Sequence, residues 1–166
     1  MTSPLDEAST PLTLDDLVKA VELREIITYK VAGERVVNEI EDLADSAQKL
    51  DGMCRADAAL VETRFQMTFE GPGVTYFADH GLVFRFEAAN TRPLPKQVLG
   101  EFMSTVGAMA AFPYLRESIT GLAARMGMPV PVIGLLRRGD LSFDLGDDAE
   151  PSAALVPEQT TATDPS

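Results

Sequence analysis

The sequence predicts an α+β fold, in which an antiparallel sheet comes first along the chain and a long helix follows it. Two segments predict the sheet, because residues 61–70 and 74–88 place apolar side chains at every second position. Between them, Gly71, Pro72 and Gly73 have the composition of a tight hairpin turn, so antiparallel pairing is expected. From Leu99 onward the apolar residues recur at helical spacing.

The N-terminus is predicted to lead into a short helix. Residues 1–12 are mostly polar and contain prolines, so they are expected to be disordered. The Thr13 hydroxyl can then cap a helix whose first turn carries Asp15 and Asp16, which suit a helix N-terminus. One domain over residues 13–145 is expected from a chain of this length.

The next segments predict a strand and then an ambiguous region. From Val21 the period is two, and one face of the strand is expected to hold Val21, Leu23, Ile27, Tyr29 and Val31. Gly33 then allows a turn. Residues 34–50 have apolar side chains at helical spacing, so the local pattern predicts a helix that Asp51 and Gly52 end.

The long strand over residues 74–88 keeps its even positions apolar, so its odd positions would face water. Two odd positions, Phe77 and Val83, are nevertheless apolar. Either a loop or a neighbouring subunit covers these two side chains, or they contact a peptide or another partner. The pattern leaves both interpretations open.

The C-terminal half is predicted to hold the long helix, an apolar loop and a tail. Pro113 lacks an amide hydrogen and disfavours the α conformation at the residue before it, so the helix is expected to be kinked or divided there. Residues 128–136 hold two prolines and a glycine among aliphatic side chains, which predicts an extended loop. Residues 146–166 are acidic and rich in Pro, Ser and Thr, which predicts a disordered tail.

Composition argues against several classes of function. The formal net charge of −12 disfavours binding to nucleic acid or anionic lipid, because phosphates are bound by clustered Lys and Arg. No apolar run reaches the ~18 residues of a membrane span, and the N-terminus lacks the pattern of a secretory signal, so a cytoplasmic location is expected. One cysteine, Cys54, and one histidine, His80, cannot form an internal disulfide or a Cys/His metal cage. No metal and no cofactor are expected.

The sequence offers only weak evidence for a catalytic site. His80 would have to serve any nucleophilic triad, and a strand turns its side chain and that of Asp79 to opposite faces. An enzyme of hot-dog-like architecture that uses Asp79 or His80 against a thioester is kept as the alternative from another class. The acidic residues Glu39, Glu41, Asp42 and Asp45 lack the spacing of a calcium loop and indicate a solvated face.

Residues 111–136 resemble the signature of the SecB chaperone family. That family has a Phe-Pro-Tyr-x-Arg-Glu run in its main helix and then a Gly-x-Pro loop with alternating aliphatic residues. The run is matched by Phe112, Pro113, Tyr114, Arg116 and Glu117, and the loop by Gly127, Pro129, Val130, Val132 and Leu135. The order of elements also agrees, with a sheet first and a long helix after it.

The resemblance implies a four-stranded antiparallel sheet with the long kinked helix packed on one face, and residues 35–46 would then form a strand. It implies an ATP-independent holding chaperone, not an enzyme, that binds unfolded precursor polypeptides and keeps them competent for export, as a homotetramer built from two dimers. SecA is a possible partner, although Thr75 and Phe77 depart from the family's acidic docking surface, and some SecB-like proteins instead serve the antitoxin of a toxin–antitoxin pair. Candidate client-binding residues are Met126, Met128, Val130, Val132, Ile133, Leu135 and Leu136, with Phe77 and Val83 in addition.

Overall fold

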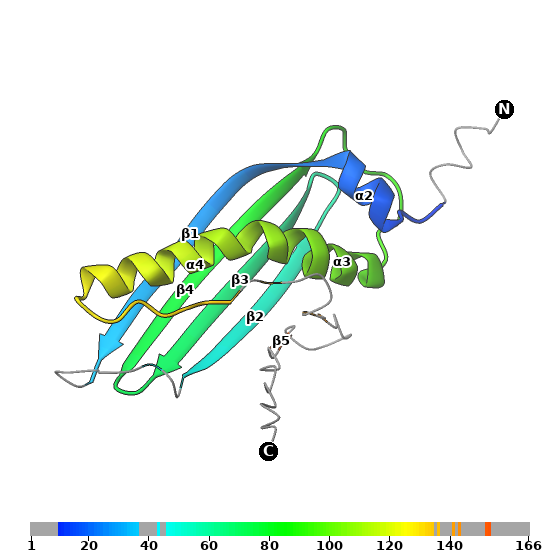
Figure 1. Ribbon diagram of the computed structural model, residues 1–166. Coiled ribbons are helices and arrows are strands. Elements are labelled where there is room, and N and C mark those ends of the chain that lie inside the picture. The colour runs from blue at the N-terminus through cyan, green and yellow to red at the C-terminus, as the bar shows by residue number, and fades with distance from the viewer. Residues whose placement is uncertain are drawn as a thin grey trace, which may run out of the picture.

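The computed structural model describes residues 10–36, 43, 46–134, 136, 141 and 143, together with the backbone of residues 152–153. A helical run crosses one face of an antiparallel sheet (Figure 1). The predicted α+β fold, with four long strands and a long helix on one face, is therefore confirmed. Its elements are α2 (Leu14–Ala20), β1 (Val21–Arg35), β2 (Ala47–Ala56), β3 (Leu60–Gly71), β4 (Val74–Phe86), α3 (Lys96–Phe102), η1 (Met103–Gly107), α4 (Ala108–Arg125) and the two-residue strand β5 (Ser152–Ala153).

The strand order is β1-β4-β3-β2-β5, and all the neighbours are antiparallel. β3 and β4 form the predicted hairpin, in which Gly71 pairs with Val74 and Gly73 adopts a φ of 73°, a value that favours glycine. β1 pairs with β4 on the other side of this hairpin. As a result β1 and β2, which follow each other along the chain, lie at opposite sides of the four-stranded sheet.

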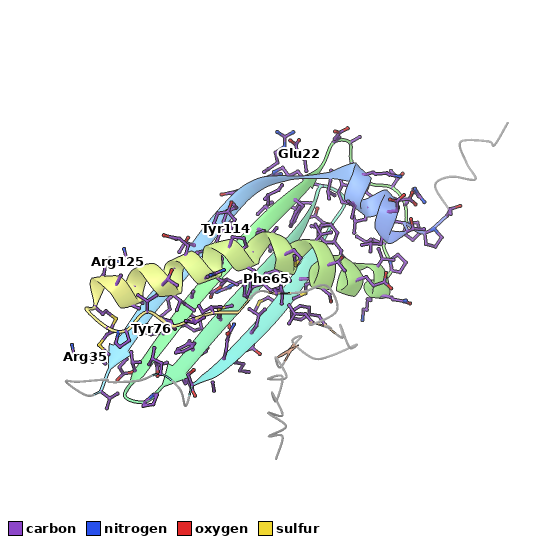
Figure 2. All side chains as sticks on the ribbon, viewed as in Figure 1. Glu22, Arg35, Phe65, Tyr76, Tyr114 and Arg125 are labelled. Carbon is purple, nitrogen blue, oxygen red and sulfur yellow. The ribbon has the colours of Figure 1, made fainter. Side chains whose placement is uncertain are left out.

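The core lies between the helical run and the sheet (Figure 2). Phe65 on β3 and Tyr76 on β4 are completely buried there, and the rings of Phe84 and Phe102 meet edge to face with centroids 5.0 Å apart. The run Lys96–Arg125 spans 30 residues and is, by length and composition, apolar enough to cross a membrane. In this chain its apolar stripe is instead buried against the sheet.

The helix is interrupted, although not where the sequence predicted. Pro113 lies inside α4 on an exposed turn, where the loss of one backbone hydrogen bond can be tolerated, and the helix continues past it. The irregular part is the π-helical segment η1, which begins at Met103, ten residues before Pro113. Gly107 ends this segment at a close approach to β3, since a Cβ there would lie 3.1 Å from Cγ2 of Thr63.

β1 does not keep the simple alternation that the sequence predicted. Irregularities in its pairing with β4 lie between Leu23 and Glu25 and between Thr28 and Lys30. Each such β-bulge adds a residue to one strand, so the faces are exchanged beyond it. Thr28 therefore bonds to the inward-facing His80, whereas Tyr29 reaches Glu62 on the outer face. The prediction that Tyr29 shares a face with Val21 was wrong.

The helical interpretation of residues 34–50 is wrong at both ends. Residues 34–35 belong to β1 and residues 47–50 to β2, while the middle, apart from Val36, Leu43 and Ser46, lies outside the described residues. Asp51 and Gly52 do not end an element but lie inside β2. Gly52 is required by packing, because a Cβ there would overlap with Met103 and lie 2.8 Å from Cε1 of Phe143.

The structure describes part of each end of the domain. The Thr13 cap is confirmed, since its hydroxyl accepts the amide of Asp16 at 3.2 Å. Residues 10–12, predicted to be disordered, are held against the segment before α3. Leu12 is buried, and the Arg92 guanidinium donates to the carbonyls of Thr10 and Pro11. In the predicted disordered tail, Ser152–Ala153 pair with β2, and the other residues of 146–166 lie outside the described part.

Candidate functional site

The extended segment that follows α4 presents apolar side chains alternately to the core and to solvent. Gly127 ends the helix with a φ of 63°, and the amide of Met128 donates to the carbonyl of Ala123 at 3.0 Å. Met128 and Ile133 are then buried against the core, at 6% and 2% exposure. Val130 and Val132 point the other way and are 51% and 94% exposed. We call residues 128–134 the extended segment.

The outward side of α4 carries further exposed apolar side chains. Met109 is 46% exposed and Tyr114 is 41% exposed, and Figure 2 shows Tyr114 on the helix side of the molecule. A hollow of about 420 Å³ lies beside Met109. It is lined by Met109, Phe112, Pro113, Arg116, Glu117, Thr120 and Leu136. The structure therefore places Phe112, Pro113, Arg116 and Glu117 of the sequence motif around one hollow.

The predicted client-binding residues thus fall into groups. Val130 and Val132 are open to solvent, and Leu136 is half-buried beside α4. Met126 is half-buried and lies over Gly33 of β1, so it holds the end of α4 on the sheet. Met128 and Ile133 are core residues and offer no side chain to a ligand in this conformation. Leu135 lies outside the described residues.

The two apolar residues predicted for the opposite face of the sheet also differ from each other. Val83 is only 5% exposed, so the chain itself covers it without a neighbouring subunit. Phe77 is half-buried, and the Lys30 ammonium lies 5.5 Å from the centre of its ring. Neither residue adjoins the extended segment, which lies on the helix side of the sheet.

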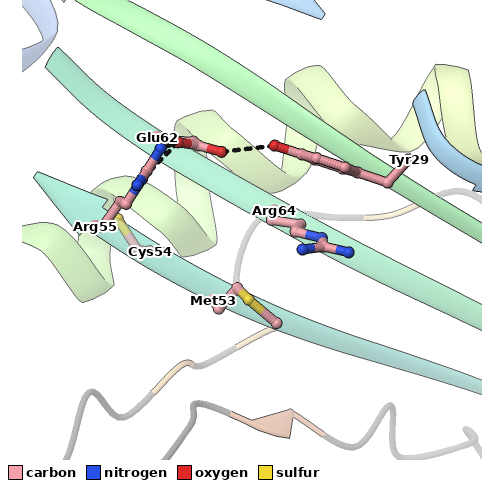
Figure 3. A pocket seen from close by; sticks show the side chains of 6 residues that line it. All are labelled: Tyr29, Met53, Cys54, Arg55, Glu62 and Arg64. Carbon is pink, nitrogen blue, oxygen red and sulfur yellow. Dashed lines mark hydrogen bonds and ion pairs between the residues drawn. The ribbon is translucent and has the colours of Figure 1, made fainter. Parts of the chain in front are cut away.

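A polar cluster on the outer face of the sheet was not predicted. Glu62 accepts hydrogen bonds from the Tyr29 hydroxyl at 2.9 Å and from Nε of Arg55 at 2.6 Å (Figure 3). Arg64 lies over the Tyr29 ring at 4.0 Å and donates two hydrogen bonds to Asp79, at 2.8 and 2.6 Å. The hydrogen bond to the Glu62 carboxylate raises the pKa of Tyr29.

The cluster borders a second hollow, of about 340 Å³ (Figure 3). Its lining comes from three strands: Tyr29 from β1, Met53, Cys54 and Arg55 from β2, and Glu62 and Arg64 from β3. Burial raises the pKa of the Cys54 thiol to about 12, so this thiol is not a nucleophile near neutral pH. Sequence alternation missed the cluster because the bulge in β1 moves Tyr29 to this face. Gly81 was the available signal, since it leaves room for the Tyr29 ring.

Asp79 and His80 do not form a catalytic pair. Asp79 is held on the outer face by Arg64 and by Gln66, which donates to it at 2.9 Å. His80 lies on the inner face, where Nδ1 is 3.1 Å from the Thr28 hydroxyl and Nε2 is 2.8 Å from the Ser118 hydroxyl. His80 is buried, and this burial lowers its pKa. The predicted separation of the two side chains is confirmed.

No group of three His, Cys, Asp or Glu side chains that could hold a metal ion occurs among the described residues. Several buried polar side chains are instead paired with one another, as in the Arg64–Asp79 and His80–Ser118 contacts, whereas the hydroxyls of Thr63 and Tyr76 are buried without a hydrogen-bond partner among the described residues. Among the accessible features that the described residues offer to a ligand are the exposed valines, the hollow beside α4 and the hollow beside Tyr29.

Comparisons with known proteins agree with this fold. No protein-family model matches the chain. Over 148 residues it is 33% identical to the SecB-like chaperone SmegB of Mycolicibacterium smegmatis. This alignment covers 87% of this chain and 97% of SmegB. The fold of this chain is similar, with a TM-score of 0.62 and 16% identity, to the Mycobacterium tuberculosis Rv1957 SecB-like chaperone in complex with a ChAD peptide from the Rv1956 HigA1 antitoxin. That similarity covers 74% of this chain and 92% of the other.

Proposed function

Because the chain belongs to the family of SecB-like chaperones, we propose that it is an ATP-independent holding chaperone that binds unfolded polypeptides and catalyses no reaction. The observation that carries this proposal is the extended segment, where Val130 and Val132 face solvent while Ile133 anchors the segment in the core. An anchored apolar surface of this kind can cover apolar parts of an unfolded client. The burial is reversible and needs no chemical energy.

The proposed mechanism requires no catalytic group. Burial of apolar surface contributes about 25 cal/mol per Å², less the entropy lost when the client becomes ordered. The hot-dog-like thioesterase alternative has little support, because Asp79 and His80 are both buried, lie on opposite faces and already bond to neighbouring side chains. Replacement of His80 by alanine separates the two functions, since a thioesterase would lose turnover and a chaperone would keep suppressing aggregation.

The proposed assembly is a homotetramer built from two dimers, and the proposed location is the cytoplasm. Met109 and Tyr114 are exposed on α4 of a single chain, and an interface with another copy would cover them. Light scattering at micromolar concentration should then report the mass of four chains. A soluble monomer would contradict this assembly.

The proposed clients are unfolded precursor polypeptides that are to be exported, and the second candidate is a single antitoxin. The second candidate is favoured by the structural neighbour, whose complex contains an antitoxin peptide. Copurification from the native host distinguishes them, because many unrelated precursors indicate export, whereas one small antitoxin indicates a dedicated chaperone. Copurification of SecA would add the export motor as a partner.

The test of client binding is suppression of aggregation of a denatured protein. We expect Val130→Asp with Val132→Asp to weaken the suppression severalfold, because a carboxylate in an apolar contact loses hydration without gaining a partner. Val18→Asp is the matched control, since Val18 is also exposed, at 42%, but lies on α2. If both variants suppress aggregation as well as the unchanged chain does, the extended segment does not bind clients.

A further inference from the structure

β2 borders the sheet on the side away from β1, and the described residues pair with only part of its outer edge. The strand has ten residues, and β5 pairs with it at Leu50 and Asp51 alone. Over the rest of its length no other described strand lies on that edge. A strand at the edge of a sheet presents backbone N–H and C=O groups that can pair with a further extended chain.

The charges along β2 leave the middle of the edge as the part that accepts a strand. Lys49 and Arg55 have side chains that are 58% and 77% exposed, and charged residues of this kind oppose pairing with foreign chains. Leu50 is buried, and Lys49 is neutralised by Asp51 at 2.8 Å. β5 lies at this middle part of the strand, opposite Leu50 and Asp51.

The sequence around β5 resembles a short apolar client. Residues 152–156 read Ser-Ala-Ala-Leu-Val, and they are bounded by Pro151 and Pro157 within an otherwise acidic and polar tail. An extended apolar stretch of this type is what a holding chaperone of the proposed function would bind. In the sequence this stretch is flanked by prolines, which have no amide hydrogen to donate to a neighbouring strand.

We propose that the outer edge of β2 binds an extended client segment as an added antiparallel strand, and that Ser152–Ala153 occupy this place as an internal competitor. The proposal rests on the chaperone function proposed above and names how the client is held. Main-chain pairing suits a chaperone with many clients, because the backbone is common to all of them. Side chains then adjust the affinity.

The outer face provides a place for such side chains. Successive side chains of an added strand point to alternate faces of the sheet. The hollow of about 340 Å³ includes Met53 and Arg55 of β2 and lies beside this edge. Apolar client side chains on that face can contact Met53, whose flexible side chain adapts to different shapes. On the inner face Phe143 lies against Gly52.

Competition between the tail and the client follows from the lengths of the two pairings. The described part of the tail forms two residue pairs with β2, whereas a client segment can pair along the whole middle of the strand between Lys49 and Arg55. The tail is tethered, however, so its effective concentration at the edge is high. Release of the tail should therefore tighten client binding by about threefold or more.

The experiment uses the full chain with Ser152→Pro and Ala153→Pro. These substitutions remove the amide hydrogens of both residues. β5 then cannot donate a backbone hydrogen bond to β2, whichever of the two amides faces that strand. Thr160→Pro with Thr161→Pro is the matched control, with two prolines in the same tail but outside residues 151–157. The probe is a labelled synthetic peptide that copies residues 151–157, compared with the same peptide N-methylated at the positions of Ser152 and Ala153. Binding is measured by fluorescence anisotropy.

The expected result is that the peptide binds the variant more tightly than the control, and that the N-methylated peptide binds neither. The peptide should also compete with a denatured client protein. Equal binding of both peptides, or equal affinity in the variant and the control, would overturn strand addition at β2. If the peptide binds as expected but no chain suppresses aggregation of a denatured protein, the edge is confirmed and the proposed chaperone function fails.

Discussion

Ile133 and Val132 are neighbours in the extended segment, and the structure predicts opposite effects of substituting them. Ile133 is 2% exposed and belongs to the core, whereas Val132 is 94% exposed. Ile133→Ala removes three carbon atoms from the core, which at about 0.8 kcal/mol for each corresponds to about 2.4 kcal/mol. Val132→Ala removes atoms that are already in water, so its effect should stay within about 0.5 kcal/mol.

The cavity left by Ile133→Ala adds little to this cost. Residues 130–134 make no backbone hydrogen bond with another described residue, so the segment can settle over the vacated space. We therefore expect a loss of about 2.5–3 kcal/mol, near the lower end of the range for such substitutions. A carboxylate at the same position, in Ile133→Asp, should unfold the domain, because it would be buried without a partner.

Urea denaturation followed by circular dichroism measures these differences. The protein concentration must be the same for all variants, because assembly adds to the apparent stability. The midpoint should fall for Ile133→Ala while the slope stays constant, and Val132→Ala should have the midpoint of the unchanged chain. A loss below about 1 kcal/mol for Ile133→Ala, or above about 1 kcal/mol for Val132→Ala, would refute the assignment of core and surface within this segment.

Three further predictions concern the sheet. Gly81→Ala should lower the free energy of unfolding by about 1 kcal/mol, because its Cβ would lie 2.7 Å from Cε2 of Tyr29 and displace this side chain from Glu62 and Arg64. In a chain that already carries Tyr29→Ala, urea denaturation should show no further loss of stability from Gly81→Ala. The free energy of unfolding should fall as the pH drops below 6.5, because the folded pKa of His80 is lowered and the unfolded chain binds the proton more readily; an unchanged slope in His80→Asn would assign this effect to other groups. Cys54, with a pKa of about 12, should react with iodoacetamide at pH 8 only after unfolding in urea, as mass spectrometry can show.

The predicted hairpin and helix come from strong local patterns that tertiary packing did not change. Alternation over residues 61–70 identified β3, and Gly71 and Gly73 identified the turn after it. The helix was also found, but the position of its irregularity depends on how closely it approaches the sheet at Gly107. A local rule for Pro113 contains no information about that contact, since the proline is on the exposed side.

β2 was not predicted because a glycine such as Gly52 can indicate either a turn or a close contact inside a strand. Read locally, Asp51 and Gly52 are turn residues. In the structure Gly52 makes room for Met103 and Phe143, which are about 50 and 90 residues away along the chain. The bulges in β1 are a similar case, because His80 and Glu62, to which Thr28 and Tyr29 are hydrogen-bonded beyond the first bulge, lie on other strands. Both features are fixed by long-range contacts, which periodicity within a strand cannot register.

The client-binding residues are harder to predict from the sequence than the fold, because the core and the binding surface of such a chaperone have the same apolar composition. Met128, Val130, Val132 and Ile133 are all apolar, and only their position against the sheet separates the buried from the exposed. Complete coverage of the two valines contributes at most about 3–6 kcal/mol. Ordering a client costs about 1–2 kcal/mol for each residue, so these contacts alone correspond to millimolar affinity or weaker.

Useful holding therefore needs contributions beyond the exposed valines. Main-chain pairing along β2 is one source, since it adds hydrogen bonds that do not depend on the sequence of the client. Several sites in one assembly are another, because a second contact made by a client already bound is intramolecular. A long unfolded protein should then bind far more tightly than a short peptide with the same apolar residues, and each individual contact should still exchange quickly. Weak contacts used together allow the client to be held and then released without ATP.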